Sequence, residues 1–242
     1  MAPRIYTPQE LLIHTNIALD PTASHHLCQV LRLKPNAELN LFNGDGQEYQ
    51  AHIIAIIGRQ VTVQLSHQWT ATSESPLSIH LVQAMAKGEK MDYLIQKAVE
   101  LGVTEFTALE SSRTVVQLNT QRAEKRLDHW RSIMIAACEQ CGRNVLPTLN
   151  PLVQFKDFLR QEQRGARLVF HPGSAIHLTQ LAGASEFTVV IGPEGGFSDE
   201  ELHKLLNAGY QSVVLGPRIL RTETAGAAVI AAINTLWGDF HD

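Results

Sequence analysis

The sequence predicts an α/β fold: a C-terminal domain whose mostly parallel sheet is covered by helices, and a small N-terminal β-barrel. After residue 76, short apolar runs alternate with helical segments, which is typical of a parallel sheet. Before residue 70, short strands surround tight turns and a single helix. Because 44% of the 242 residues are hydrophobic and 18% are charged, the chain can bury a sizeable core. The polar segment 70–76 marks the boundary, giving domains 1–72 and 73–242.

The N-terminal domain begins with one short helix and continues as a hairpin. A helix is expected from residue 21 or 22 to about Leu33, where Pro35 stops it. The run Leu39-Asn-Leu-Phe-Asn-Gly-Asp-Gly46 is a strand that enters an Asn-Gly, Asp-Gly turn, a strong hairpin signal. Further strands are expected at 49–57 and 60–65.

The C-terminal domain alternates strands and helices. Strands are expected at 77–85, 103–109, 168–171, 187–191 and 212–215, and helices at 88–101, 120–141, 152–162, 199–207 and 223–237. Ligands on such sheets bind at the carboxyl ends of the strands.

The overall composition narrows the class of function. The formal net charge of -4 argues against a broadly basic nucleic-acid binder, although a local basic groove is compatible with it. No run reaches the roughly 18 apolar residues that span a bilayer, and the N-terminus has no signal-peptide pattern. Three cysteines indicate a reducing compartment. We therefore expect a cytoplasmic protein without a membrane partner.

Two glycine-rich loops are the most informative feature of the chain. In each loop, a short apolar run ends in Gly-Pro and a turn follows. The loops are Ile191-Gly-Pro-Glu-Gly-Gly196 and Leu215-Gly-Pro-Arg218. Because glycines allow the main chain to approach a ligand closely, the two loops could wall one small-molecule site. Two ordinary turns between strands and helices would also explain the spacing.

The polar and charged residues near these loops could bind a ligand or serve the protein structure. Glu194 could meet a cationic ligand group or point to solvent, whereas Ser198 and Glu201 form a capping box and are structural. Arg218 and Arg221 suit a phosphate or a developing base anion, or form loose surface ion pairs.

Other motifs exclude more than they indicate. Cys138-Glu-Gln-Cys141 has the spacing of a metal or redox pair, but no second cysteine pair completes a zinc site. The chain has no phosphate-binding G-x-x-x-x-G-K-[ST] loop, no G-x-S-x-G elbow and no G-x-G-x-x-G fingerprint. We therefore expect no metal.

Taken together, motifs along the whole chain resemble the RsmE family of small-subunit ribosomal RNA methyltransferases, within the SPOUT superfamily. The matching segments are Arg4-Ile-Tyr6, His26-Leu-Cys-Gln-Val-Leu-Arg32, Leu41-Phe-Asn-Gly-Asp-Gly46, Lys87-Gly-Glu-Lys-Met91, Gln96-Lys-Ala-Val-Glu-Leu-Gly-Val103, Ala137-Cys-Glu-Gln-Cys-Gly-Arg-Asn144, Ile191–Gly196 and Leu215–Ala225.

The resemblance implies a SPOUT-type C-terminal domain with a deep trefoil knot and an N-terminal PUA-like RNA-binding β-barrel. It also implies S-adenosyl-L-methionine as the cofactor, a homodimer, and methylation of N3 of a uridine in 16S rRNA of the small ribosomal subunit.

Carried over residue by residue, the resemblance assigns the cofactor to three loops. These contain Phe170, His171, Pro172, Ile191, Gly192, Pro193, Glu194, Gly195, Gly196, Leu215, Gly216, Arg218, Leu220, Thr222 and Thr224. Beside them we expect Arg221 to stabilise the anion of the target base and Glu223 to act as base or orienting partner.

Four arginines are the expected RNA contacts: Arg4, Arg32, Arg113 and Arg143. The sequence departs from the family after Arg113-Thr-Val-Val116, where Gln117 replaces the usual lysine or arginine.

Three other functions remain open from the residues alone. The chain could be an RNA-binding module with a degenerate cofactor site, or an oxidoreductase that uses a nucleotide cofactor. It could also be a methyltransferase that acts on tRNA or large-subunit rRNA.

Overall fold

The computed structural model describes residues 2–71, 73–114 and 120–240, and it divides the chain into two compact units. The first unit contains residues 1–74 and 135–146, and the second contains residues 75–134 and 147–242. The segment 135–146, which the predicted boundary places in the second domain, thus packs with the N-terminal residues.

The first unit is built on a five-stranded sheet of order β1-β3-β4-β5-β2. The strands are β1 (Arg4–Tyr6), β2 (Asn16–Ala18), β3 (Glu38–Phe42), β4 (Gln47–Ile57) and β5 (Gln60–Thr70). All pairs are antiparallel except β1 with β3. The expected helix is present as α1 (Pro21–His25), followed by a π-helical turn over His26–Val30. Buried side chains such as Leu27, Leu41 and Val63 form the core of this unit.

The predicted hairpin is confirmed, and its turn residues explain it. The side chain of Asn43 accepts the amide of Asp45, and the side chain of Asp45 accepts the amide of Gln47. Gly44 and Gly46 have φ values of +98° and +85°, which other L-residues rarely adopt. The turn therefore fixes where β3 and β4 pair.

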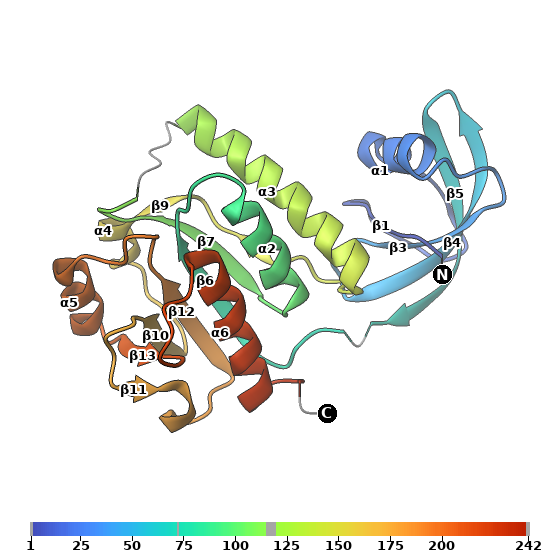
Figure 1. Cartoon of the computed structure of the whole chain (residues 1–242). Helices are drawn as coiled ribbons and strands as arrows, with labels where there is room; N and C mark the ends of the chain where they lie inside the picture. Colours follow the sequence, from blue (N-terminus) through green and yellow to red (C-terminus); the bar gives the residue numbers. More distant parts are fainter. Residues whose placement is uncertain (1, 72, 115–119, 241–242) are drawn as a thin grey trace. The chain divides into compact units, whose positions relative to one another are not determined.

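The second unit contains an eight-stranded sheet in which every pair is parallel, as predicted (Figure 1). The order along the sheet is β11-β13-β10-β12-β6-β7-β8, and β9 also pairs with β7. The strands are β6 (Ser78–Ala84), β7 (Glu105–Glu110), β8 (Thr148–Leu149), β9 (Val153–Gln154), β10 (Ala166–Phe170), β11 (Ile176–His177), β12 (Glu186–Ile191) and β13 (Gln211–Val214).

Helices cover both faces of this sheet. They are α2 (Lys90–Glu100), α3 (Thr120–Cys141), α4 (Phe155–Phe158), α5 (Asp199–Asn207) and α6 (Thr222–Trp237), with a 3₁₀ turn at Leu178–Gln180. The residues of α3 from 135 onward belong to the first unit. Phe158 of α4 and Leu205 of α5 pack on Val82 and Val190. On the opposite face α6 lies beside α2 (Figure 1). A Cβ on Gly226 of α6 would stand 2.7 Å from Cδ1 of Leu94 in α2. The small residues of α6 thus allow close packing.

One predicted helix is much shorter than expected. The segment 152–162 forms a single helical turn, α4, because Val153 instead pairs as a strand with Leu109 of β7. The two-residue strands β8 and β11 were not predicted, since two residues carry no alternating pattern. In the described part of the chain, no helix is long and apolar enough to cross a membrane.

Candidate active site

A cavity of about 340 Å³ opens in the second unit where β10, β12 and β13 end. Three loops form its walls, and most of the lining is apolar side chain or backbone. Lining residues are Lys90, Phe170, His171, Pro172, Ile191, Gly192, Pro193, Glu194, Gly196, Phe197, Val213, Val214, Leu215, Gly216, Arg218, Ile219, Leu220, Arg221, Thr222, Ala225 and Val229. The volume falls in the range of small-molecule sites.

The loop after β12 turns sharply beside the cavity. The Gly196 amide donates to the Pro193 carbonyl over 2.9 Å, and Gly196 has a φ of +68°. A Cβ on Gly192 would meet the Phe197 ring at 3.2 Å. Glycine at these positions therefore lets the main chain form the wall of the cavity itself.

A buried hydrogen-bond chain ties this loop to the start of α6. Gln83 Nε2 donates to Thr222 Oγ1 over 2.7 Å, and that hydroxyl donates to the Gly192 carbonyl over 2.6 Å. Thr222 was predicted to contact the cofactor, but its hydroxyl proton is already used within the protein. Its geometry is that of a residue that positions the loop. Gln83 was missed, because a lone glutamine inside a strand gives no sequence signal.

Lys90 links two carboxylates at one side of the cavity. Its ammonium lies 3.0 Å from Glu194 Oε1 and 3.8 Å from Glu223 Oε2. Burial opposes the charged form of Glu194, but hydrogen bonds from Lys90 and from the Lys87 amide outweigh it. They hold the pKa of Glu194 below its ordinary value. The loop glutamate is therefore an anion that pairs with α2.

The Glu223 carboxylate has unused bonding capacity. Its side chain is 14% exposed, and Oε2 is buried without a hydrogen-bond donor among the described residues. A buried carboxylate oxygen in this state is costly unless it meets a donor. This atom can therefore accept a proton or a hydrogen bond from a bound molecule.

Two arginines of the loop before α6 line the cavity. Arg221 is the N-cap residue of α6, and Arg218 lies three residues before it; both are exposed. Across the described residues, neither guanidinium takes part in a hydrogen bond or ion pair. Both are therefore available to an anionic or developing anionic group.

The structure brings together most of the residues assigned to the cofactor. Gly195 and Thr224 are exposed and outside the lining, and Glu223 lies beside it. Seven lining residues were not singled out: Lys90, Phe197, Val213, Val214, Ile219, Ala225 and Val229. Lys90 could have been found, because it stands in a motif that carries the family resemblance.

Two of the predicted RNA contacts remain open to solvent. Arg32 is exposed with a φ of +54°. Arg113 is also exposed, but one of its nitrogens donates to the Gly195 carbonyl over 2.9 Å and so braces the glycine loop. Gln117 lies outside the described residues.

The other two predicted RNA contacts are buried in the first unit. The Arg4 side chain is 10% exposed, pairs with Glu48 and donates to the Cys138 carbonyl over 2.6 Å. Arg143 is 3% exposed and pairs with Glu74 over 2.7 Å. Because both guanidiniums are engaged internally, the geometry favours a structural role over a phosphate contact.

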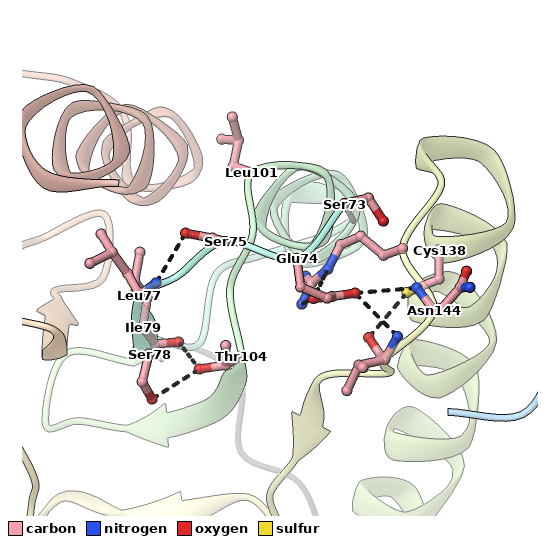
Figure 2. Close-up of polar contacts among 12 residues, drawn as sticks. Ser73, Glu74, Ser75, Leu77, Ser78, Ile79, Leu101, Thr104, Cys138 and Asn144 are labelled. Atoms are coloured by element: carbon pink, nitrogen blue, oxygen red, sulfur yellow. Dashed lines mark hydrogen bonds and ion pairs between the residues drawn. The ribbon is translucent and has the colours of Figure 1, made fainter. Parts of the chain in front are cut away.

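The same cluster anchors the segment 135–146. The Glu74 carboxylate also accepts the Asn144 amide over 3.2 Å (Figure 2). Burial raises the pKa of the Cys138 thiol to about 12, so this cysteine is not a thiolate near neutral pH. Within the described residues, no group of three or more His, Cys, Asp or Glu side chains is placed to hold a metal ion.

Comparison with known proteins places the chain in a family. Residues 73–234 match the model of an RNA methyltransferase domain, and residues 19–66 match the PUA domain of RNA methyltransferases. The ribosomal RNA small subunit methyltransferase E of Buchnera aphidicola from Acyrthosiphon pisum is 35% identical over 98% of this chain and 95% of its own. This chain belongs to the ribosomal RNA small subunit methyltransferase E family.

Solved structures of similar proteins have the same fold. A Legionella pneumophila methyltransferase in complex with SAM is 38% identical, with a TM-score of 0.96 over 99% of this chain and 100% of its own. The Neisseria gonorrhoeae ribosomal RNA small subunit methyltransferase E bound to S-adenosyl methionine is also 38% identical, with a TM-score of 0.93 over the same shares. Family membership thus extends to both units of the chain.

Proposed function

We propose that the protein uses S-adenosyl-L-methionine to methylate N3 of a uridine in 16S rRNA of the small ribosomal subunit. The observation that carries this proposal is the cavity at the ends of β10, β12 and β13. Two Gly-Pro loops form part of its walls, its lining is mainly apolar, and it includes Arg218 and Arg221, which have no partner among the described residues. Relatives that share both units have been solved with this cofactor.

The residues present fit the cofactor chemically. Leu215, Leu220 and Ile191 supply apolar surface for an adenine ring, and the adjoining loop backbone supplies donors and acceptors for its edge. When bound, S-adenosyl-L-methionine supplies an electrophilic methyl group: its bond to sulfur breaks, with the electron pair left on sulfur, as a bond to uridine N3 forms. Glu194 and Glu223 place negative charge near a molecule that carries a sulfonium and an ammonium group.

Uridine N3 must lose its proton to become a nucleophile. Glu223 Oε2, which has no donor in the described protein, is the proposed acceptor or orienting group. The Arg221 guanidinium is the proposed partner of the negative charge that develops on the pyrimidine ring. Their shared position at the start of α6 sets both groups beside the same cavity.

RNA recognition and assembly complete the proposal. We infer that the first unit binds RNA, with Arg32 among its phosphate contacts, and that Arg113 acts at the glycine loop. We further propose that the second unit contains a deep trefoil knot and that the active protein is a homodimer in the cytoplasm. The domain limits 1–72 and 73–242 stay a prediction.

One assay tests the reaction and its target together. Purified protein would receive cofactor with a radiolabelled methyl group and small ribosomal subunits from a strain that lacks this enzyme. Digested rRNA should contain labelled 3-methyluridine. Label in tRNA or large-subunit rRNA instead would change the target, whereas no label and no cofactor binding would leave an RNA-binding module. Shifts in melting temperature with nicotinamide cofactors would indicate an oxidoreductase.

A further inference from the structure

An exposed aromatic pair lies near the end of β5 in the first unit. The rings of His67 and Trp69 stack, with centroids 6.1 Å apart and planes 26° apart. Both side chains are exposed, Trp69 to 37%. The buried residues of β5 that build the core, Val61, Val63 and Leu65, all precede this pair. The two rings therefore need an explanation other than core packing.

A β-bulge turns the pair away from the core. Leu65 pairs with Ala51, but His67 pairs with Gln50, so Ser66 is an extra residue in β5. Because paired residues share one face of a sheet, His67 and Trp69 lie on the face of Gln50 and Glu48. Uninterrupted alternation would have continued the core-facing series of Val61, Val63 and Leu65. Bulges of this kind often redirect side chains at functional sites.

The sheet edge beside the pair is open. Strand β2 pairs with β5 from Thr62 to Gln64, and the Thr15 carbonyl accepts the Leu65 amide. Along residues 66–70, β4 is the sole neighbouring strand that the described chain provides. A planar ligand can therefore approach the rings from solvent.

Polar groups lie beside the rings. Gln50 shares their face, and Ser66 Oγ donates to the Gln50 carbonyl over 3.3 Å. The Glu48 carboxylate, which is on the same face, is buried and paired with Arg4. The surface thus offers aromatic faces together with an amide and a hydroxyl.

We propose that His67 and Trp69 form a stacking platform for an unpaired base of the RNA substrate. This inference rests on the proposed function, which supplies RNA as the ligand. Proteins recognise single-stranded RNA by stacking bases on exposed aromatic side chains and bonding the base edges to polar groups. A ring pair beside the Gln50 amide and the Ser66 hydroxyl matches that chemistry, whereas phosphate contacts need cations and core packing needs burial.

Substitution of Trp69 is the direct test. Trp69→Ala should raise the Kd for a fluorescein-labelled single-stranded oligoribonucleotide, and the KM for small ribosomal subunits, about 10-fold. Trp69→Phe keeps an aromatic face and should retain most of the affinity. Cofactor affinity, kcat and the slope of log Kd against log salt should not change, because no phosphate contact or catalytic group is removed. Melting temperatures would verify that the variants fold.

Two exposed side chains elsewhere provide matched controls. Ile57 is 77% exposed near the other end of the same hairpin, and Tyr93 is a 52% exposed aromatic on α2. Ile57→Ala and Tyr93→Ala should bind RNA as the parent does. Equal losses in these controls, or unchanged binding by Trp69→Ala, would overturn the platform. So would equal binding of an abasic oligonucleotide, which carries phosphates but no bases.

The outcomes separate this platform from the proposed reaction. Normal methylation together with unchanged RNA affinity in Trp69→Ala removes the platform alone. Trp69-dependent oligonucleotide binding by a parent protein that transfers no methyl group removes the reaction and leaves the platform. A stable complex with a protein strand paired on β5, blocked by Trp69→Ala while RNA affinity is unchanged, would assign the edge to a protein and overturn the inference.

Discussion

The arginines of the two units differ in what their guanidinium groups meet. In the first unit, Arg4 and Arg143 are nearly inaccessible and bond to carboxylates and carbonyls. At the cavity of the second unit, Arg218 and Arg221 are exposed and have no partner among the described residues. The same residue type therefore serves structure in one region and is available for ligand in the other.

Removing an arginine should therefore have different consequences in the two regions. A buried charge whose partner is removed destabilises the fold, because the remaining charge stays desolvated. A solvent-exposed charge without a partner contributes little to folding, so its removal changes only what it would bind. Substitutions in the two regions should accordingly affect different measurements, stability in one and activity in the other.

The largest expected effect is on stability, from Arg4→Met. The change leaves the Glu48 carboxylate, 10% exposed, without its charged partner, which should cost about 3–5 kcal/mol in the free energy of unfolding. Urea denaturation measures it, and Arg32→Met is the exposed control, expected within about 0.5 kcal/mol of the parent. A stable Arg4→Met with weaker RNA binding and a lower salt slope would restore Arg4 as a phosphate contact.

At the cavity, Arg221→Ala should affect the reaction and spare the fold. Loss of a donor to the developing anion should lower kcat about 10²–10³-fold, with an unchanged unfolding curve and cofactor Kd. Single-turnover methyl transfer and cofactor titration measure the two effects. Arg221→Lys retains the charge and should recover part of the rate. Parental turnover by the alanine variant would contradict the assignment.

The sequence predicted the order of strands and helices better than it predicted which charged side chains are buried and which are exposed. Turn residues such as Gly44 and the alternation of strands and helices depend on local chemistry, which neighbouring residues determine. The capping box of Ser198 and Glu201 was likewise predicted and is present. The loops of the cavity could be located because both Gly-Pro motifs follow apolar runs that form strands, β12 and β13.

Long-range partners could not be read from the sequence. Arg4 is buried by residues 44 to 140 positions away, so no local pattern distinguishes it from exposed Arg32. The bulge at Ser66 is equally invisible, because it depends on how β4 and β5 pair. Glu201 also makes a long-range bond that was not predicted. Besides completing the cap of α5, its carboxylate accepts a hydrogen bond of 2.7 Å from the amide of Ser112, 89 positions away.

Glu223 at the cavity offers a further test of the contrast between activity and stability, with a smaller expected effect than Arg221. Glu223→Gln keeps the shape of the side chain but removes a proton acceptor, so kcat should fall about 10²-fold. Stability should stay within about 1 kcal/mol of the parent, because among the described residues Oε2 has no hydrogen bond to lose, and its 3.8 Å ion pair with part-exposed Lys90 is weak. Methyl-transfer rates and urea denaturation measure the two properties. A fully active Glu223→Gln would remove Glu223 from the proposed chemistry.

The smallest effect is expected at Glu201, whose carboxylate is satisfied within the protein. Burial opposes its charged form, but bonds from Ser112 and Ser198 outweigh it and hold the pKa of Glu201 below its ordinary 4.5. A depressed pKa stabilises the fold at pH values above the unfolded value, and this contribution disappears as pH falls through the folded value. Glu201→Gln should therefore cost about 1–2 kcal/mol at pH 7.

The pH dependence supplies the decisive comparison for Glu201. The stability gap between parent and Glu201→Gln, measured by urea denaturation, should narrow as pH falls below about 4.5, where the unfolded carboxyl begins to take up its proton. Glu200→Gln is the matched control, because Glu200 is 78% exposed and, among the described residues, pairs with Lys204 on the surface of α5. Its cost should be at most about 0.5 kcal/mol. A gap for Glu201→Gln that stays constant with pH would mean that the hydrogen bonds act without regard to charge, and the carboxylate would then serve only as a cap.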